Sequence, residues 1–411
     1  MKKGIIVITS TLIAITLFYG QTRTTEKAEA EAAAANAPFS DVTTHWASAS
    51  ISRAAKEGYV GGFTDGTFRP NNTITRAEFI SILVRASGGS GEPATASPFS
   101  DVPATYWAAS DITAAVTKGY LNVKDFAGGA FKPNQPLTRY EMAKWLVQGL
   151  MKTDKGYDQA YEDTKSTLLP FVEQGKGQIS QVMTPYIAVA LGSGLMAGLP
   201  DGNFGIANTT TRAEACVLLY RYLNAASKEA SSFLALDELR EVGTTGTNVV
   251  SRGNADFSKY RNTLGEVIGH EINFKNGAAT FKIEKYIVVD ADVGVTDRGV
   301  YFPLFNDPAT YKGEYPNEYE VYALLTVTTK TSITNSTTLA SGYNFITSPY
   351  RVDEKQAQKY GLPILDRPTF LALGEKGVTK SYWVKEDYVH KGGIPISILT
   401  ADGLQTAIYL K

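Results

Sequence analysis

The sequence predicts an α+β multidomain protein in which an all-α module of three helix-loop-helix repeats, arranged as pseudo-trimeric prongs, precedes a β-sandwich. One motif recurs three times in the first half of the chain, and β-branched and aromatic residues dominate the second half. With 411 residues and 43% hydrophobic content, the chain is long enough for two or three packed units. The predicted segments are a signal peptide with spacer (1–37), the repeats (38–98, 99–160 and 161–227), a linker (228–256) and a β-rich domain (257–411).

The N-terminus is typical of an export signal. Lys2 and Lys3 precede an apolar stretch over residues 5–18 that is shorter than a typical membrane-spanning helix, and the best-placed cleavage site ends at Ala37. Cleavage nearer the apolar stretch, or retention as an anchor, stays open. We therefore expect an exported protein with no membrane segment in its mature form.

The charge balance and the cysteine content limit the classes of partner and the disulfides that this chain can have. Forty basic residues balance 41 acidic ones, so no overall field would recruit nucleic acid. The single cysteine, Cys216, excludes an intramolecular disulfide, and its position four residues after Arg212 predicts a buried, inert thiol. An exported chain without disulfides suits a Gram-positive-type surface.

Each repeat of about sixty residues begins with one short signature and ends with another. The repeats open with Phe39-Ser40-Asp41-Val42, Phe99-Ser100-Asp101-Val102 and, more weakly, Tyr161-Glu162-Asp163-Thr164. They close with Thr75-Arg76-Ala77-Glu78, Thr138-Arg139-Tyr140-Glu141 and Thr211-Arg212-Ala213-Glu214. A first helix, a turn and a loop lie between the signatures, and the closing Thr-x-x-Glu is the capping box of a second helix. Because one unit of this size buries little core, the three are expected to pack together.

These motifs, together with the Trp-Ala after the opening and the Gly-Tyr that ends the first helix, closely resemble the S-layer homology family over residues 38–227. The resemblance implies a spindle of three prongs whose grooves bind secondary cell-wall polysaccharide, commonly with pyruvylated sugar ends. It also implies a cell-wall or S-layer location.

Candidate glycan-binding residues follow from the repeats. Arg76, Arg139 and Arg212 lie in the first turn of a helix, where the macrodipole disfavours a cation, and an anion docked there would meet a guanidinium fork and free N–H groups. The alternative is an arginine paired with a neighbouring carboxylate or lying over the protein surface. Trp46 and Trp107 would stack on a sugar face or belong to the core.

The opening carboxylates are Asp41, Asp101 and Asp163, which would contact glycan, cap helices, or do both. The third repeat departs from the pattern: Val182 aligns with Trp46, and Gly205-Ile206 replaces the Arg/Lys-Pro pair of the first two repeats. Grooves built mainly from the first two repeats are therefore ranked above the third.

The second half predicts about seven strands, with an immunoglobulin-like topology as an analogy. The strands are expected near residues 281–289, 319–329, 343–347, 369–373, 381–390, 394–399 and 406–410. Three histidines in the whole chain argue against a poly-histidine metal centre or a serine triad. Asp290, Asp292 and Asp297 lack EF-hand spacing, so a solvated turn is favoured over a calcium site.

We therefore expect a non-enzymatic surface protein without metal or cofactor. Its repeats hold secondary cell-wall polysaccharide, and its β-rich domain is displayed for adhesion, ligand binding or self-association in a surface layer. The alternative is a tethered enzyme acting on polysaccharide, whose paired carboxylates would leave no spacing signature.

Overall fold

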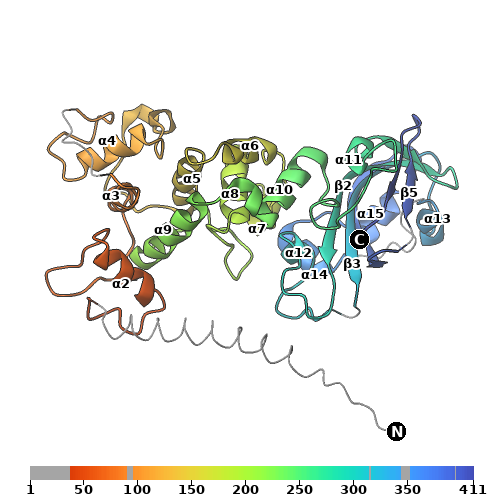
Figure 1. The fold of residues 1–411 in the computed structure, drawn as a ribbon. Coiled ribbons are helices and arrows are strands. Elements are labelled where there is room, and N and C mark those ends of the chain that lie inside the picture. Colours follow the sequence, from red (N-terminus) through yellow and green to blue (C-terminus); the bar gives the residue numbers. More distant parts are fainter. Residues whose placement is uncertain (1–37, 90–95, 314–315, 344–351, 394) are drawn as a thin grey trace, which may run out of the picture. The chain divides into compact units, whose positions relative to one another are not determined.

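The computed structural model describes residues 38–89, 96–313, 316–343, 352–393 and 395–411, and the signal-peptide prediction lies outside them. The described chain forms two compact units (Figure 1). The first unit joins residues up to 138 with 209–224, and the second joins 139–208 with 225–411. Helices and antiparallel sheets are both present, which confirms the α+β prediction. No helix among the described residues is long and apolar enough to span a membrane.

The helices of the first unit belong to the repeats. They are α2 (Ser48–Lys56), α3 (Arg76–Ala86), α4 (Ala109–Thr117), most of α9 (Arg212–Ala226) and the 3-10 turns η1 (Val123–Asp125) and η2 (Ala127–Gly129). The predicted capping box opens α3: the Thr75 side chain accepts from Glu78 N, and Glu78 Oε2 accepts from Thr75 N at 2.8 Å. The same reciprocal bonds join Thr211 and Glu214 at the start of α9, where Thr211 N donates to Glu214 Oε2 at 2.7 Å and Glu214 N donates to Thr211 Oγ1 at 3.2 Å. Arg76 and Arg212 therefore lie in the first turns of their helices.

A closed ring of backbone hydrogen bonds joins the three repeats within the first unit. Ile74 N donates to Thr210 O, Thr210 N donates to Leu137 O, and Leu137 N donates to Ile74 O, each at 2.9 Å. Each of these residues directly precedes the threonine of a closing signature. The ring satisfies backbone groups that a single repeat would leave unpaired, and it makes the three repeats mutually dependent.

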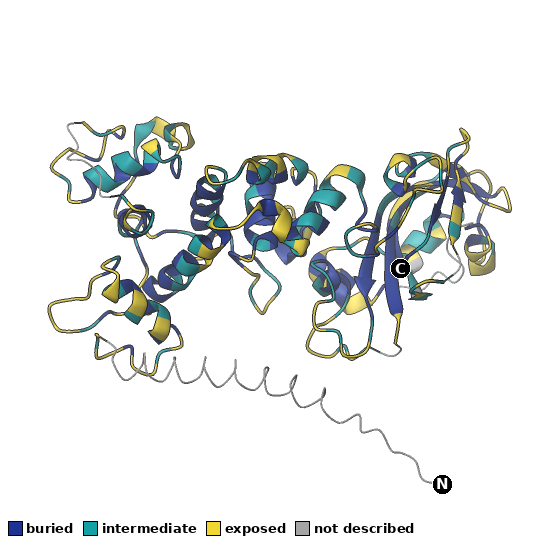
Figure 2. Ribbon diagram, viewed as in Figure 1, coloured by how far each residue is buried: buried dark blue, intermediate teal, exposed yellow. Residues whose placement is uncertain are grey.

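The second unit begins with helices of the second and third repeats. They are α5 (Arg139–Leu150), α6 (Lys155–Asp163), α7 (Val172–Gly175) and α8 (Thr184–Gly192), followed by η3 (Ala230–Ser232) and α10 (Leu234–Thr245). Figure 2 shows how much of α5 and α8 is buried.

The segment predicted as a linker, 228–256, contains the packed helix α10 instead. Leu236, Leu239 and Val242 are buried at helical spacing, and α10 contacts α6 and α8. Gly243 lets the helix approach closely, because a Cβ there would lie 2.0 Å from the Asp163 carbonyl oxygen. The sequence suggested a linker from polarity, but this apolar stripe makes the segment part of a core.

The C-terminal part is built on a four-stranded antiparallel sheet in the order β1-β2-β3-β4, with a separate ribbon β5-β6. The strands are β1 (Glu271–Asn273), β2 (Ala279–Asp290), β3 (Glu318–Thr329), β4 (Thr379–His390), β5 (Ile396–Leu399) and β6 (Gln405–Ile408). The short helix α11 (Leu264–Val267) precedes the strands, and four others lie between them: α12 (Phe302–Phe305), α13 (Ser336–Ala340), α14 (Glu354–Tyr360) and α15 (Arg367–Ala372).

The two faces of the sheet carry different layers. Phe281, Ile283 and Val288 face an apolar core that includes the β5-β6 ribbon. On the opposite face Phe305 of α12 stacks on Tyr322 with ring centroids 3.9 Å apart. The long central strands β2 and β3 are therefore buried on both sides (Figure 2).

The predicted sandwich with immunoglobulin-like topology is not confirmed. Strands do occur near 281–289, 319–329, 381–390, 394–399 and 406–410, but residues 369–373 lie in and just after α15, where Asp366 caps Thr369 N at 2.8 Å. Most of 343–347 lies outside the described residues. Six described strands in one sheet and one ribbon, with helices between them, give an α+β arrangement.

The third repeat packs directly against the C-terminal part inside the second unit. Thr167 Oγ1 donates to Leu239 O at 2.7 Å and lies 3.0 Å from the Tyr301 hydroxyl. Gly175 of α7 meets α14, where a Cβ would lie 1.7 Å from the Tyr360 carbonyl oxygen. The third repeat is thus joined to the C-terminal domain by backbone-close contacts.

Candidate functional site

The three predicted arginines are buried, and each donates to the backbone of the following repeat in a cyclic order. Arg76 Nη1 donates to Phe131 O at 2.7 Å, Arg139 Nε to Phe204 O at 2.9 Å, and Arg212 Nε to Phe68 O at 2.9 Å. We call these places junctions and number them by the repeat that supplies the loop. The first junction joins Arg212 to Phe68, the second Arg76 to Phe131, and the third Arg139 to Phe204.

The guanidinium groups therefore hold the repeats together as well as carrying charge. Arg139 Nη2 and Arg212 Nη2 each reach a second carbonyl, at 2.9 and 3.0 Å. Burial lowers the pKa of Arg212, an effect opposed by the Glu78 carboxylate at 3.4 Å and reinforced by the charge of Arg69. The sequence analysis weighed anion binding against pairing with a carboxylate or a position on the surface, and it did not foresee these bonds to the carbonyls of another repeat.

A carboxylate organises the loop of each junction. Asp41 accepts from Phe68 N and Arg69 N, both at 2.8 Å, and Asp101 accepts from Phe131 N at 2.8 Å and Lys132 N at 2.7 Å. Two acceptor oxygens on two adjacent N–H groups fix the backbone of the loop.

In the third repeat Glu173, and not Asp163, has this position. Glu173 accepts from Phe204 N, Gly205 N and Ile206 N. Asp163 ends α6 and instead pairs with Arg240 Nε at 2.9 Å. The missed signal is a phenylalanine two residues before each carboxylate, in Phe39, Phe99 and Phe171. Their rings lie 5.3, 5.2 and 5.4 Å from those of Phe68, Phe131 and Phe204.

The carboxylates support a left-handed backbone residue in each loop. Arg69 has φ 58° and Lys132 has φ 56°, whereas the third repeat has Gly205 with φ 80° at this place. A side chain in this conformation costs about 1–2 kcal/mol, which glycine avoids. The first two junctions thus keep a strained, exposed cation beside the buried arginine, and the third does not.

Trp46 and Trp107 are exposed rather than part of the core. They are 66% and 58% exposed, and Val182, at the aligned position of the third repeat, is 68% exposed. Each tryptophan follows a residue that is hydrogen-bonded to its own repeat's loop: His45 Nε2 lies 3.2 Å from Asn71 Oδ1, and the Tyr106 hydroxyl donates to Asn134 Oδ1 at 2.9 Å. These contacts place an indole beside the loop that carries the cation.

The first two junctions therefore bring together an exposed indole, a loop cation and a buried arginine. The third junction has only the arginine, Arg139 of the second repeat, with Val182 and Gly205 at the other two positions. Such an arrangement offers an apolar plate for a sugar ring and two neighbouring cations for an anion, although at the first junction Arg69 Nη2 also lies 3.0 Å from Asp65 Oδ2.

Other candidate groups have structural partners. Cys216 is fully buried, and burial raises the pKa of its thiol to about 12. Lys391 Nζ lies 2.9 Å from Asp290 Oδ2 and 2.6 Å from Asp292 Oδ2, so an ammonium group occupies the turn considered for calcium. Asp297 pairs with Arg252 at 3.2 Å. No group of three or more His, Cys, Asp or Glu side chains in the described ranges is arranged to hold a metal ion.

Similarity to known proteins falls on the same repeats. Residues 38–80, 98–143 and 177–216 match the profile of the S-layer homology domain. Cell surface glycoprotein 1 of Acetivibrio thermocellus is 34% identical over 167 residues, 40% of this chain and 7% of the relative.

Two further relatives show the same partial coverage. Amylopullulanase of Thermoanaerobacterium thermosulfurigenes is 29% identical over 185 residues, covering 45% of this chain and 9% of the enzyme. Cellulosome-anchoring protein of Acetivibrio thermocellus is 37% identical over 76 residues, covering 18% of this chain and 17% of the relative. The matched part is thus a small fraction of each of these relatives.

Proposed function

We propose that this chain, which carries three S-layer homology domains, is a cell-surface protein held non-covalently on the bacterial wall by an anionic secondary cell-wall polysaccharide. Its first two junctions bind the glycan, and its C-terminal domain is displayed. The observation that carries this assignment is the repeated placement of an exposed tryptophan beside a strained loop cation at the first two junctions, and its loss at the third.

The chemistry of each junction fits an acidic sugar. The indole of Trp46 or Trp107 offers an exposed face for the C–H groups of a pyranose ring. Arg69 and Lys132 are exposed and reach solvent, so they can meet a carboxylate such as that of a pyruvyl ketal. Arg76 and Arg212 add positive charge from within the junction while they hold its walls.

The test is co-sedimentation of residues 38–411 with purified cell-wall sacculi, before and after chemical removal of the secondary polysaccharide. The variant is Trp46→Ala with Trp107→Ala, because these exposed side chains can be truncated without opening a core. We expect binding to require the polysaccharide and to fall by about tenfold or more in the variant. Alanine at Arg76 or Arg139 is less informative, since it also breaks contacts between repeats.

The control is Val182→Ala, which truncates the aligned exposed residue of the third repeat and should leave binding unchanged. A second variant, Arg69→Gly with Lys132→Gly, gives the first two junctions the glycine that the third already has. It should weaken wall binding without loss of thermal stability. Equal pelleting with stripped walls, or full binding by the tryptophan variant, would exclude the glycan assignment.

The role of the C-terminal domain is part of the same proposal. We assign it to display, including self-association in a surface layer, and we assign it no catalysis. The alternative, a tethered polysaccharide-acting enzyme, is motivated by relatives such as amylopullulanase, whose match covers 45% of this chain. Release of reducing ends from wall polysaccharide by residues 38–411 would favour the enzyme.

A further inference from the structure

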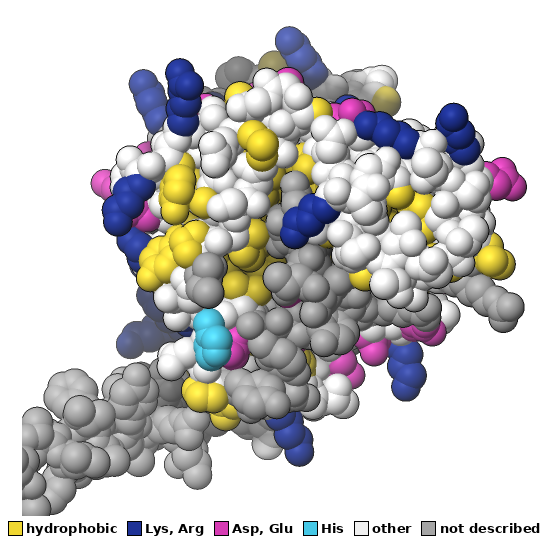
Figure 3. Space-filling view, turned by 90° about the vertical axis from the view of Figure 1, so that its right-hand side faces the viewer, with side chains coloured by type: hydrophobic (Ala, Val, Ile, Leu, Met, Phe, Trp, Pro, Cys, Tyr) yellow, Lys and Arg dark blue, Asp and Glu magenta, His cyan; other side chains and the backbone are white. Residues whose placement is uncertain are grey.

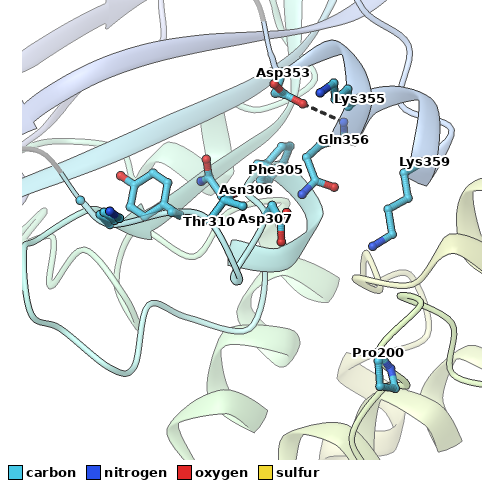
Figure 4. Close-up of a pocket in the computed structure, with 12 residues that line it drawn as sticks. Pro200, Phe305, Asn306, Asp307, Thr310, Asp353, Lys355, Gln356 and Lys359 are labelled. Atoms are coloured by element: carbon cyan, nitrogen blue, oxygen red, sulfur yellow. Dashed lines mark hydrogen bonds between the residues drawn. The ribbon is translucent and has the colours of Figure 1, made fainter.

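A cavity of about 950 Å³ lies in the second unit, between the third repeat and the C-terminal domain. Its walls come from the turn at Pro200, from α12 and the segment after it, and from α14 (Figure 4). The volume is in the range of small-molecule sites, about 300–1,000 Å³. Small-molecule sites commonly lie at interfaces between domains.

Three lysines around this cavity have no salt bridge within the described part of the chain. They are Lys312, Lys355 and Lys359, all exposed. The two carboxylates of the lining are engaged with backbone instead: Asp353 Oδ1 accepts from Gln356 N at 2.9 Å, and Asp307 Oδ1 accepts from Ala309 N at 3.0 Å. The lining therefore carries three ammonium groups against two carboxylates, none of them joined in a salt bridge among the described residues. Hydrogen bonds from Asn203, together with the charge of Lys359, lower the pKa of the neighbouring Asp201.

A buried amide completes the site. Gln356 is 7% exposed, and within the described residues its Oε1 has no hydrogen-bond partner. Figure 4 shows the amide pointing toward Asp307 inside the cavity. A buried acceptor without a donor is unfavourable in the free protein, and the O–H of a ligand would satisfy it.

The remaining wall is rigid and polar. Asn306 and Tyr311 line the cavity, and both donate to the buried carboxylate of Glu320, at 2.9 and 3.0 Å. Glu320 also accepts from the Tyr322 hydroxyl at 2.8 Å and pairs with Lys385 at 3.0 Å. These bonds hold the polar wall in one geometry before any ligand arrives.

We propose that this cavity binds an acidic saccharide. The lysines meet its carboxylate or phosphate group, and Gln356 accepts a hydroxyl. The face of the molecule in Figure 3 shows Lys and Arg interspersed with Asp, Glu and apolar side chains, so that face is not uniformly basic. This site is separate from the junctions of the repeats, so it would give the displayed domain its own ligand.

The experiment is calorimetric titration of residues 38–411 carrying Trp46→Ala and Trp107→Ala, which removes the proposed wall-binding plates. The probes are trigalacturonic acid, glucose 6-phosphate, neutral cellotriose and inorganic phosphate. We expect one or both acidic sugars to bind, and cellotriose and phosphate to bind about tenfold more weakly or not at all. The two acidic sugars distinguish a carboxylate ligand from a phosphorylated one.

Two sets of variants assign binding to the cavity. Lys355→Ala with Lys359→Ala should weaken it by about tenfold or more, whereas the control Lys376→Ala with Lys380→Ala, two exposed lysines of the same domain, should not. Gln356→Met removes the acceptor at similar volume. It should weaken binding while thermal stability stays unchanged or rises, since a buried unsatisfied oxygen is lost.

Three results would overturn the assignment. They are no binding of either acidic sugar, phosphate binding as tightly as the sugars, or equal losses in the two lysine pairs. Failure here would leave the wall-binding result untouched, because the titration is made without the tryptophans on which that result depends.

Discussion

Replacing Glu173 by glutamine tests the position of the third carboxylate. Glu173 is 5% exposed, and its two oxygens receive N–H groups from Phe204, Gly205 and Ile206. Glutamine keeps the shape but turns one acceptor oxygen into an NH₂ donor that faces other donors. One or two charge-assisted hydrogen bonds are lost, each worth about 1.5–3 kcal/mol. We expect the local free energy of unfolding to fall by roughly 2–4 kcal/mol.

Hydrogen exchange measured by mass spectrometry suits this prediction. A chain with two compact units has no single well-defined unfolding midpoint, whereas amide exchange reports local opening. A loss of 2–4 kcal/mol corresponds to exchange about 30- to 1,000-fold faster in the peptide containing residues 204–206.

The matched control is Asp163→Asn, which makes the same change of charge at the residue favoured by the sequence repeat. Asp163 holds Arg240 in a partly exposed ion pair, so its loss should cost about 1 kcal/mol or less and leave residues 204–206 protected. If Asp163→Asn accelerates exchange there as much as Glu173→Gln, the assignment of Glu173 is wrong.

Two further predictions concern close packing. Native protein at pH 8 should not react with Ellman's reagent, because burial raises the pKa of the Cys216 thiol to about 12, and one thiol per chain should appear in guanidinium. Reaction of the native protein would contradict this burial. Gly175→Ala should destabilise the second unit by about 1–3 kcal/mol, because its Cβ would meet the Tyr360 carbonyl. Amide exchange in the peptides of α7 and α14 should therefore become faster, whereas the control Gly61→Ala, where a Cβ meets nothing within 4 Å, should leave exchange unchanged throughout. Unchanged exchange of α7 and α14 in Gly175→Ala would refute the clash.

Local signals in the sequence were sufficient for much of the repeat module. The Thr-x-x-Glu boxes fixed the starts of the second helices, and the register of their arginines followed directly. The burial of Arg76, Arg139 and Arg212 could not be predicted, because their partners are carbonyl groups of another repeat, and backbone acceptors leave no mark in a sequence.

The loop carboxylate of the third repeat was assigned to the wrong residue, Asp163, for a similar reason. A carboxylate after a phenylalanine marks each loop, but Asp163 stood at the expected distance and Glu173 lay ten residues further along. Two helices, α6 and α7, separate the second repeat from the third loop. Only the pairing of Phe171 with Phe204 shows which carboxylate belongs to the loop.

In the second half, alternation or runs of β-branched and aromatic residues correctly predicted the long strands β2, β3 and β4. The two central strands, β2 and β3, are buried on both faces. The same pattern failed at 369–373, because the short run of Thr and Phe there follows a capping aspartate and a proline that start a helix. Periodicity over so few residues does not separate the two structures. The cavity beside α14 combines segments far apart in the chain, so no motif could indicate it.

The closed backbone ring of the repeats also sets the order in which the protein can fold. The hydrogen bond between Arg212 and Phe68 joins residues 144 positions apart in the sequence, and the bond from Ile74 N to Thr210 O likewise joins the first repeat to the third. A chain that emerges N-terminus first therefore exposes the apolar surface of its first repeat until the third has emerged. Because contacts between residues so far apart in the sequence slow folding, we expect the repeat module to assemble late. A nascent chain would acquire its hold on the wall only after the whole repeat region had been delivered.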